Sequence, residues 1–331
     1  MVERATGTDE PGTGPGPLGS GRAMAVRLVA VAVTLLLALV VAYVVVILSG
    51  PPTVDDLRDR AGLDGKRELL VGVKDDQPGV AEYRPDGTWA GFDIDIAHLI
   101  AEELDFRRSE VRFLAIESED RARMQAVGTD RRRIGVDLVI ASYSITPERE
   151  ATAGVTFSAP YLYTEQSVVT LKAHAPVATL EDLRGRKVCS LATATSEGPA
   201  QRAGAQVISR KRISECFRAL DAGDVEAVST DAAILAGFVH RDPGKYTHHD
   251  IGLDAIEAWG VNVGENEALR DLVDLALYRS RNDAGDARWE EAYDRHLRRE
   301  QTADDTASIA VDQQPTVGEV AVRQWPWERV G

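Results

Sequence analysis

Residues 136–149 carry side chains suited to holding a small charged molecule. The segment reads VDLVIASYSITPER, in which a buried strand leads into a hydroxyl-rich turn and then a helix start at Pro147. In open α/β sheets, ligands bind beyond the carboxyl ends of strands, where backbone N–H groups and helix N-termini favour a negative group. Arg149 would supply a bidentate fork for a carboxylate, beside the Ala141 carbonyl and the Ser144 hydroxyl and N–H. The segment therefore predicts a carboxylate site.

Arg149 also has an ordinary structural interpretation. It lies between Glu148 and Glu150, and a surface ion pair with either neighbour needs no ligand. The residue types alone leave both interpretations open.

A second candidate charge follows a second strand. Residues 225–229 have an apolar strand pattern, and Asp231 stands directly before an apolar helical run at residues 232–238. Asp is among the best helix N-caps, which would explain this residue without a ligand. The alternative is that its carboxylate meets an ammonium group, so that Arg149 and Asp231 hold the two ends of an α-amino acid. Both interpretations remain open at this point.

Apolar patterns with strand and helix periods alternate along the chain and would position these side chains. The expected strands cover residues 68–73, 111–114, 136–141, 168–171, 187–191, 206–209 and 225–229. The expected helices cover residues 93–104, 213–222, 267–281 and 287–299, with a further helical stretch around 121–127. Such alternation predicts an α/β fold with parallel sheets and helices on both faces.

The N-terminal part predicts attachment to a membrane. Residues 1–22 are rich in Gly, Pro and Thr and predict a disordered cytoplasmic tail, whereas residues 23–48 are apolar and long enough for one transmembrane anchor. A removed signal peptide is the alternative, although such a segment has a shorter apolar region. Residues 49–65 are expected to form a linker, and residues 301–331 a disordered tail. We expect a single-pass protein of the cell membrane whose globular part is extracytoplasmic.

The composition narrows the class of partner. The 331 residues include 53 acidic and 38 basic side chains, and the net charge of −15 argues against the basic face that nucleic acids require. His248 and His249 have no Cys or carboxylate at metal-ligand spacing, and no clear acid/base pair suggests catalysis. A small molecule is the expected partner, with no nucleic acid, metal or cofactor, and we do not expect an enzyme.

Cys189 and Cys216 are the only two cysteines, and both lie in the part expected outside the cytoplasm. An even pair in such a compartment predicts a disulfide bond. Two unrelated buried thiols are the alternative.

Six ordered segments carry a resemblance to a known family. They are VGVK from Val71, DQPG from Asp76, GFDIDIA from Gly91, VDLVIASYSIT from Val136, FSAPY from Phe157 and LEDLRG from Leu180. As a set, they resemble the bacterial extracellular solute-binding proteins of the polar-amino-acid family, which serve ABC uptake transporters. The resemblance runs from Leu69 to Leu297. The paired cysteines and the segment STDAAILAG from Ser229 are most similar to the glutamate-binding branch.

The resemblance implies a two-lobed type II periplasmic-binding-protein fold, here preceded by a single transmembrane helix. Lobe 1 would comprise residues 66–160 plus 257–300, and lobe 2 residues 161–256. Two crossing strands, near residues 160–166 and 256–261, would join the lobes and act as the hinge.

The resemblance also assigns roles to individual residues. Arg149 would bind the ligand α-carboxylate with help from Ala141 and Ser144, and Asp231 would bind the ammonium group. A loop of lobe 2, residues 193–196, would add N–H groups to the carboxylate, facing a lobe 1 loop at 75–77. The expected ligand-binding set is Arg149, Asp231, Ser144, Ala141, Ser142, Thr195, Ser196, Asp76, Thr230 and Arg121.

The identity of the amino acid depends on which charges face the cleft. Arg121 or Arg123 in the cleft would favour an acidic side chain, whereas Asp75 and Asp76 together would favour a basic or neutral one. The expected order is glutamate or aspartate, then glutamine or asparagine, then basic amino acids. We expect a binding protein that delivers its ligand to the permease subunits of an ABC importer. The alternative is a membrane-anchored amino-acid sensor that acts through a membrane partner.

Overall fold

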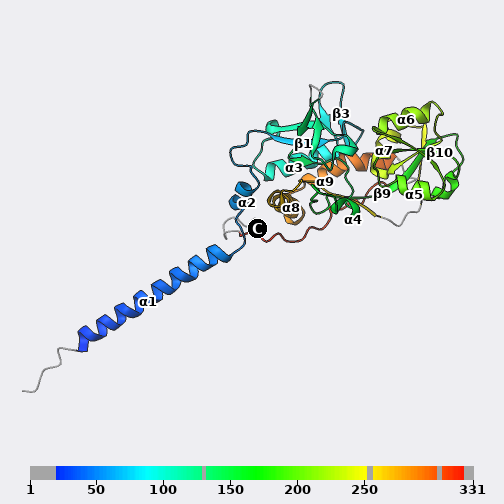
Figure 1. Ribbon diagram of the computed structural model, residues 1–331. Coiled ribbons are helices and arrows are strands. Elements are labelled where there is room, and N and C mark those ends of the chain that lie inside the picture. Colours follow the sequence, from blue (N-terminus) through cyan, green and yellow to red (C-terminus); the bar gives the residue numbers. More distant parts are fainter. Residues whose placement is uncertain (1–19, 129–131, 252–255, 304–307, 324–331) are drawn as a thin grey trace, which may run out of the picture. The chain divides into compact units, whose positions relative to one another are not determined.

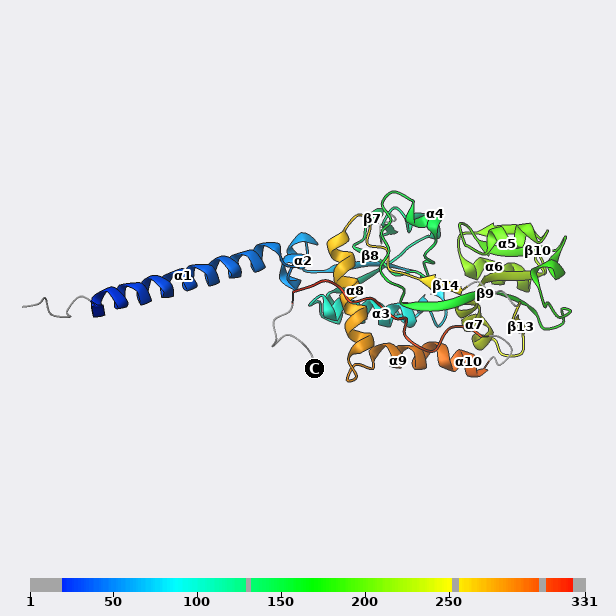
Figure 2. The same ribbon diagram turned by 90° about the horizontal axis from the view of Figure 1, so that it is seen from below.

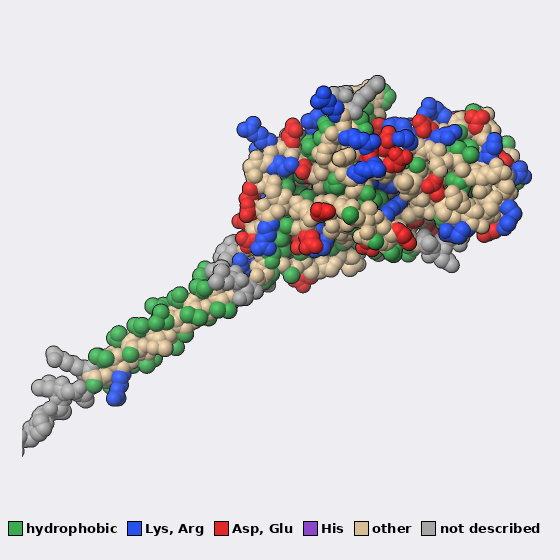
Figure 3. Space-filling view, viewed as in Figure 1, with side chains coloured by type: hydrophobic (Ala, Val, Ile, Leu, Met, Phe, Trp, Pro, Cys, Tyr) green, Lys and Arg blue, Asp and Glu red, His purple; other side chains and the backbone are tan. Residues whose placement is uncertain are grey.

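The computed structural model describes residues 20–128, 132–251, 256–303 and 308–323, so most of the expected cytoplasmic tail lies outside the described residues. The chain divides into two units, residues 1–51 and 52–331. In the first unit, helix α1 (Ser20–Ser49) contains a 23-residue apolar segment, Ala23–Val45. The hydrophobic side chains of this segment are exposed and appear in green in Figure 3. Its length and composition fit one transmembrane helix or a signal sequence.

The second unit begins with a helix at the place of the expected linker. Helix α2 (Val54–Arg60) starts with a capping box, in which the Thr53 hydroxyl accepts from the Asp56 N–H and the Asp56 carboxylate accepts from the Thr53 N–H. Leu57 is only 2% exposed, because α2 packs against helix α8 (Glu267–Asn282). The linker prediction is therefore wrong over α2.

Lobe 1 is built on a five-stranded sheet in the order β7-β6-β5-β1-β8. Its strands are β1 (Leu69–Val73), β5 (Val111–Ala115), β6 (Gln125–Val127), β7 (Arg133–Gly135) and β8 (Leu138–Val139). Strand β1 pairs in parallel with β5 and β8, whereas β6 and β7 pair antiparallel. Helix α3 (Phe92–Glu103) packs against β1 and α8.

The helical stretch expected around residues 121–127 is wrong. The chain there forms the short helix η2 (Ser118–Asp120), a turn, and strand β6. Met124 in this turn has a φ of 53°, which an α-helix cannot contain.

Lobe 2 is built on a second sheet in the order β11-β10-β12-β9-β13. Its strands are β9 (Leu162–Leu171), β10 (Lys187–Leu191), β11 (Gln206–Arg210), β12 (Ala227–Asp231) and β13 (Tyr246–His249). Strand β10 is parallel to β11 and β12, but β9 is antiparallel to β12 and β13. The sheet is therefore mixed rather than purely parallel, because β9 enters it from lobe 1.

Helices cover both faces of the lobe 2 sheet, with α6 (Ile213–Asp221) and α5 (Glu197–Arg202) on opposite sides (Figure 1). Helix α7 (Ala232–Arg241) follows β12 directly and packs against β9. Neighbouring residues of β10 point to opposite faces, since Val188 and Cys189 belong to separate core clusters. Cys189 forms a disulfide bond with Cys216 of α6, which confirms the predicted pair.

Two strands join the lobes. Strand β14 (Ile256–Trp259) pairs antiparallel with the first residues of β9, from Ile256 opposite Glu165 to Trp259 opposite Leu162 (Figure 2). The crossing strands lie where the resemblance places them. The boundaries given above for the two lobes remain our proposal.

The remaining elements are short. They are β2 (Asp76–Gln77), β3 (Ala81–Tyr83), β4 (Trp89–Ala90), η1 (Arg108–Glu110), α4 (Pro147–Glu150), η3 (Leu180–Leu183), α9 (Arg288–Tyr293), η4 (Asp294–Arg298) and α10 (Arg299–Ala303). Strands β2, β3 and β4 form a small antiparallel sheet in lobe 1.

The expected disordered tail is packed over residues 308–323. The Ile309 side chain is fully buried, and its carbonyl accepts a 2.6 Å hydrogen bond from the Thr164 hydroxyl of β9. The Arg323 N–H donates to the Pro52 carbonyl at 2.8 Å, at the start of the second unit. The prediction of disorder is wrong for this stretch, because its apolar side chains and backbone groups find partners in the second unit.

Candidate functional site

Arg149 spans the cleft between the lobes. It lies in the single-turn helix α4, whose N-cap Thr146 accepts a 3.3 Å hydrogen bond from the Arg149 N–H. Its guanidinium donates to the Ser144 carbonyl at 2.7 Å and, across the cleft, to the Thr193 carbonyl of lobe 2 at 2.9 Å. Arg149 is thus directed into the cleft rather than toward its acidic neighbours in the sequence.

Arg121 is the second arginine of the site and is only 4% exposed. Its guanidinium donates to the Ala141 and Ser142 carbonyls at 3.2 and 3.1 Å. Both guanidiniums lie over the Tyr143 ring, at 4.3 Å for Arg121 and 4.8 Å for Arg149. Burial and the neighbouring Arg149 charge lower the pKa of Arg121 to about 9.

Asp231 is the acidic group of the site and is 4% exposed. It begins α7, yet its side chain makes no N-capping hydrogen bond and instead accepts a 2.6 Å bond from the Trp259 indole N–H. Burial and the nearby Glu257 carboxylate raise the pKa of Asp231 to about 7, although Trp259 and the arginines oppose this shift. The capping explanation is therefore wrong.

These three charged residues line one small cavity. Its lining consists of Arg121, Ser142, Ser144, Arg149, Leu191, Ala194, Thr195, Thr230, Asp231 and Ile234. The cavity volume is about 10 Å³, which is room for about one water molecule. An amino acid therefore requires the lobes to separate or the arginine side chains to turn.

Three expected site residues lie elsewhere. Ala141 is fully buried, and its carbonyl is occupied by Arg121. Ser196 lies inside lobe 2, where its hydroxyl is 2.8 Å from the Ser190 hydroxyl. Asp76 accepts a 3.0 Å hydrogen bond from the Ser214 N–H and so contacts lobe 2 beside the cavity rather than lining it.

Several other residues of the site had little signal in the sequence. Tyr143 stacks both arginines, Trp259 orients Asp231, and Leu191 and Ile234 add apolar walls. Tyr143 stands between two expected serines, so its place in the hydroxyl-rich turn was the available signal.

A buried lysine lies near Arg121. Lys74 is 3% exposed and donates a 2.7 Å hydrogen bond to the Ser118 hydroxyl. Burial and the nearby Arg121 lower the pKa of Lys74 to about 7. Within the described residues, no group of three or more His, Cys, Asp or Glu side chains could hold a metal ion.

A family model for bacterial extracellular solute-binding proteins, family 3, matches residues 69–298. The chain belongs to this family. The match confirms the resemblance seen in the motifs and covers both lobes. The fold of the second unit is accordingly that of the type II amino-acid-binding proteins.

Several relatives of the chain have known names. The glutamate-binding protein GluB of Corynebacterium glutamicum is 32% identical over 242 residues, which cover 67% of this chain and 78% of the relative. The ABC transporter glutamine-binding protein GlnH of Bacillus subtilis is 26% identical, over 72% of this chain and 88% of the relative. A solved structure of an ancestral arginine-binding protein bound to glutamine is 28% identical with a TM-score of 0.61, covering 70% of this chain and 98% of that structure.

Proposed function

We propose that this protein binds a free amino acid between its lobes, outside the cytoplasm, and delivers it to an ABC importer. The observation that carries the proposal is the convergence of Arg149 and Asp231 on one buried cavity. A guanidinium and a carboxylate there match the carboxylate and ammonium of an α-amino acid. Ser144, Thr195 and Thr230 add hydroxyl groups around the same space.

The charges around the cavity favour an acidic amino acid. Arg121 lines the cavity as a second guanidinium. A ligand with two carboxylates would therefore give each arginine a counter-charge. Asp75, which would disfavour such a ligand, pairs at 2.8 Å with Arg212 of lobe 2 and does not line the cavity. Glutamate or aspartate is therefore the proposed ligand, in agreement with the names of the Corynebacterium relatives.

Isothermal titration of residues 52–331 with the twenty amino acids tests this function. We expect tight binding of glutamate or aspartate, and loss of at least about a hundredfold in affinity for Arg149→Ala and for Asp231→Ala, since each breaks a buried charge pair. Arg218→Ala, on the exposed side of α6, is the matched control. Correctly folded protein that binds no amino acid would refute the proposal.

Arg121→Gln tests the choice of ligand separately. We expect this variant to lose more affinity for glutamate than for glutamine, because only the former places a charge against residue 121. Equal losses for both ligands would show that Arg121 holds the backbone of the turn and does not select the side chain.

We propose that α1 stays attached and anchors the protein in the membrane. The exposed 23-residue apolar segment is long enough to span a bilayer. Mass spectrometry of the chain from native membranes should then find the residues before Ser49 still present. A released chain that begins after α1 would identify the helix as a signal sequence.

A further inference from the structure

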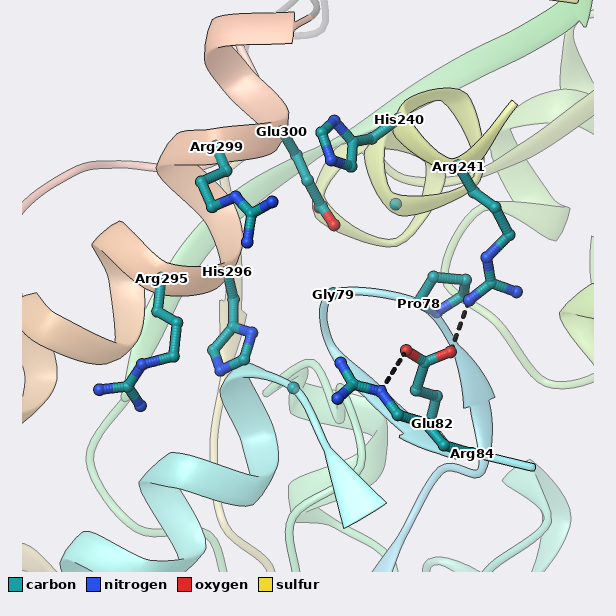
Figure 4. Close-up of a pocket in the computed structure, with 12 residues that line it drawn as sticks. Pro78, Gly79, Glu82, Arg84, His240, Arg241, Arg295, His296, Arg299 and Glu300 are labelled. Atoms are coloured by element: carbon teal, nitrogen blue, oxygen red, sulfur yellow. Dashed lines mark hydrogen bonds and ion pairs between the residues drawn. The ribbon is translucent and has the colours of Figure 1, made fainter. Parts of the chain in front are cut away.

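A second pocket, of about 250 Å³, lies apart from the amino-acid cavity and shares none of its lining residues. Four arginines line it together with two glutamates: Arg84, Arg241, Arg295, Arg299, Glu82 and Glu300. We call this hollow the arginine pocket. Figure 4 shows Arg295 and Arg299 on one side and Arg241, Glu82 and Arg84 on the other. This concentration of arginines is unexpected in a chain whose net charge is −15.

Three carboxylates pair with these arginines: Glu82, Asp95 and, 3.9 Å from Arg295 and outside the pocket lining, Glu291. Glu82 accepts from Arg84 at 3.3 Å and also forms a short contact with Arg241. Asp95, in an adjoining hollow, accepts from Arg295 at 2.6 Å. Within the part of the chain that the structure describes, the Arg299 side chain has no ion pair and no hydrogen bond. Arg84 and Arg241 therefore share one carboxylate, and Arg299 has none among the described residues.

Glu300 does not supply the missing negative charge. Its side chain is 5% exposed, and its Oε2 atom has no hydrogen-bond partner among the described residues. Burial, together with the nearby Glu82 charge, raises the pKa of Glu300 well above its ordinary value. The protonated carboxyl is a hydrogen-bond donor, and Figure 4 shows it directed into the pocket.

The backbone beside Glu300 leaves this carboxyl little freedom. A Cβ atom at Gly79 would come within 2.0 Å of Glu300 Oε1, and Gly79 has a φ of 76°. The carboxyl is therefore packed against a loop that only glycine fits at this position.

We propose that the arginine pocket binds a phosphate group, as a free dianion or a small phosphate monoester. Two uncompensated positive charges match a dianion, and planar guanidiniums bind phosphate oxygens in pairs. The Glu300 carboxyl adds a neutral donor to an oxygen that carries no proton. A single carboxylate would leave one guanidinium without a counter-charge.

The pocket lies where the two lobes meet. Arg241 and His240 come from the end of α7 in lobe 2, whereas Arg84 follows β3 in lobe 1. Helix α7 approaches lobe 1 so closely that a Cβ at Gly237 would lie 1.9 Å from the Pro78 carbonyl oxygen. A phosphate group in the pocket therefore contacts both lobes at once.

The test is titration of the full chain, in an uncharged and phosphate-free detergent at low salt, with inorganic phosphate and separately with glycerol phosphate. Amino acids are left out, so the result does not depend on the function proposed above. We expect saturable binding of inorganic phosphate below about 10 mM, and binding about tenfold weaker in Arg299→Gln, the value expected for one lost charge-assisted contact. Arg218→Gln, an exposed arginine of α6 outside the pocket, should bind as the native chain does.

Each outcome decides the proposal. Binding of both probes identifies the phosphate group as the recognised feature, and binding of inorganic phosphate alone identifies the free ion. Absence of saturation up to about 10 mM, or equal binding by Arg299→Gln and the native chain, overturns the proposal. A thermal unfolding curve for Arg299→Gln that matches the native curve excludes misfolding as the cause of a loss.

Discussion

Asp231 is buried, yet it must carry a negative charge to bind the ammonium group of an amino acid. Its pKa is raised to about 7, mainly by burial, and only the ionised carboxylate can pair with an ammonium group. Amino-acid affinity should therefore be constant above about pH 8 and fall by up to tenfold per pH unit below about pH 7. Titrations between about pH 5 and about pH 9 would measure this dependence, and buffers of different ionisation enthalpy would detect the released proton. An affinity that stays flat down to about pH 5 would contradict the role given to Asp231.

The same burial predicts a cost in stability. Because the pKa is raised from 3.8 in the unfolded chain to about 7 in the folded one, ionising Asp231 destabilises the fold increasingly between these values and fully above pH 7. Asp231→Asn removes this cost, since the amide oxygen can still accept from Trp259. We expect the variant to gain about 4 kcal/mol in free energy of unfolding at about pH 8 and almost nothing at about pH 4. Urea unfolding at the two pH values would measure the difference, and an equal effect at both would exclude ionisation as the cause.

For single residues, the sequence could predict which charged side chains belong to the site, but not the direction in which each side chain points. Arg149, Asp231 and Arg121 converge as the expected set requires, because each follows a strand end or turn that the sheet brings to the cleft. Ser196 and Asp76 lie in equally polar segments, yet Ser196 bonds to Ser190 and Asp76 bonds to Ser214. Which way a short polar side chain turns depends on partners distant in sequence, and a single sequence does not display them.

Among the elements, the C-terminal segment differs most from expectation. Residues 308–323 have no helix or strand period, so their packing leaves no trace in the pattern. Their stability comes from single contacts, such as the buried Ile309 side chain and the Thr164 hydrogen bond to its carbonyl. By contrast, the capping box at Thr53 and Asp56 was a readable signal for the start of α2. The helix itself has too few apolar residues to show a helical period.

The packed segment predicts a difference between two neighbouring substitutions. Ile309 is fully buried, whereas Val311, two residues later, is 42% exposed. Ile309→Ala should lower the free energy of unfolding by about 2–4 kcal/mol, and Val311→Ala by less than about 1 kcal/mol. Thermal and urea unfolding of both variants would measure this. If the two losses are equal and small, residues 308–323 do not contribute to the folded unit.

The disulfide bond joins β10 to α6 within lobe 2. Cys189 and Cys216 are separated by 27 residues, and both side chains are fully buried. Removing the bond in the double variant Cys189→Ser and Cys216→Ser should cost between about 3 and about 4 kcal/mol in the chain-entropy description. Denaturant unfolding of this variant, compared with the native chain with and without reductant, would measure the loss. Native-like stability of the reduced chain would show that the core of lobe 2 alone fixes the two elements.

At the scale of the whole molecule, polar contacts connect the lobes on several sides of the amino-acid cavity. Arg149 reaches Thr193, Asp76 accepts from Ser214, and Arg212 pairs with Asp75. The two crossing strands connect the lobes covalently, and strands of this kind permit the lobes to rotate when the contacts between them break. A contact that forms only in the closed state stabilises that state, relative to the open one, by the free energy of the contact.

Arg212 allows this coupling to be measured without touching the cavity. It holds Asp75 with two hydrogen-bonding distances of 2.8 and 3.0 Å, and its side chain is 42% exposed. A partly exposed pair of this kind contributes about 1 kcal/mol, so Arg212→Ala should weaken amino-acid binding about fivefold, through faster dissociation. Stopped-flow fluorescence can follow the release, since the Trp259 indole donates a hydrogen bond to Asp231, which lines the cavity. Arg218→Ala, in the helix that follows, provides the comparison: if the two variants release the ligand at the same rate, the contact between Arg212 and Asp75 does not hold the lobes together.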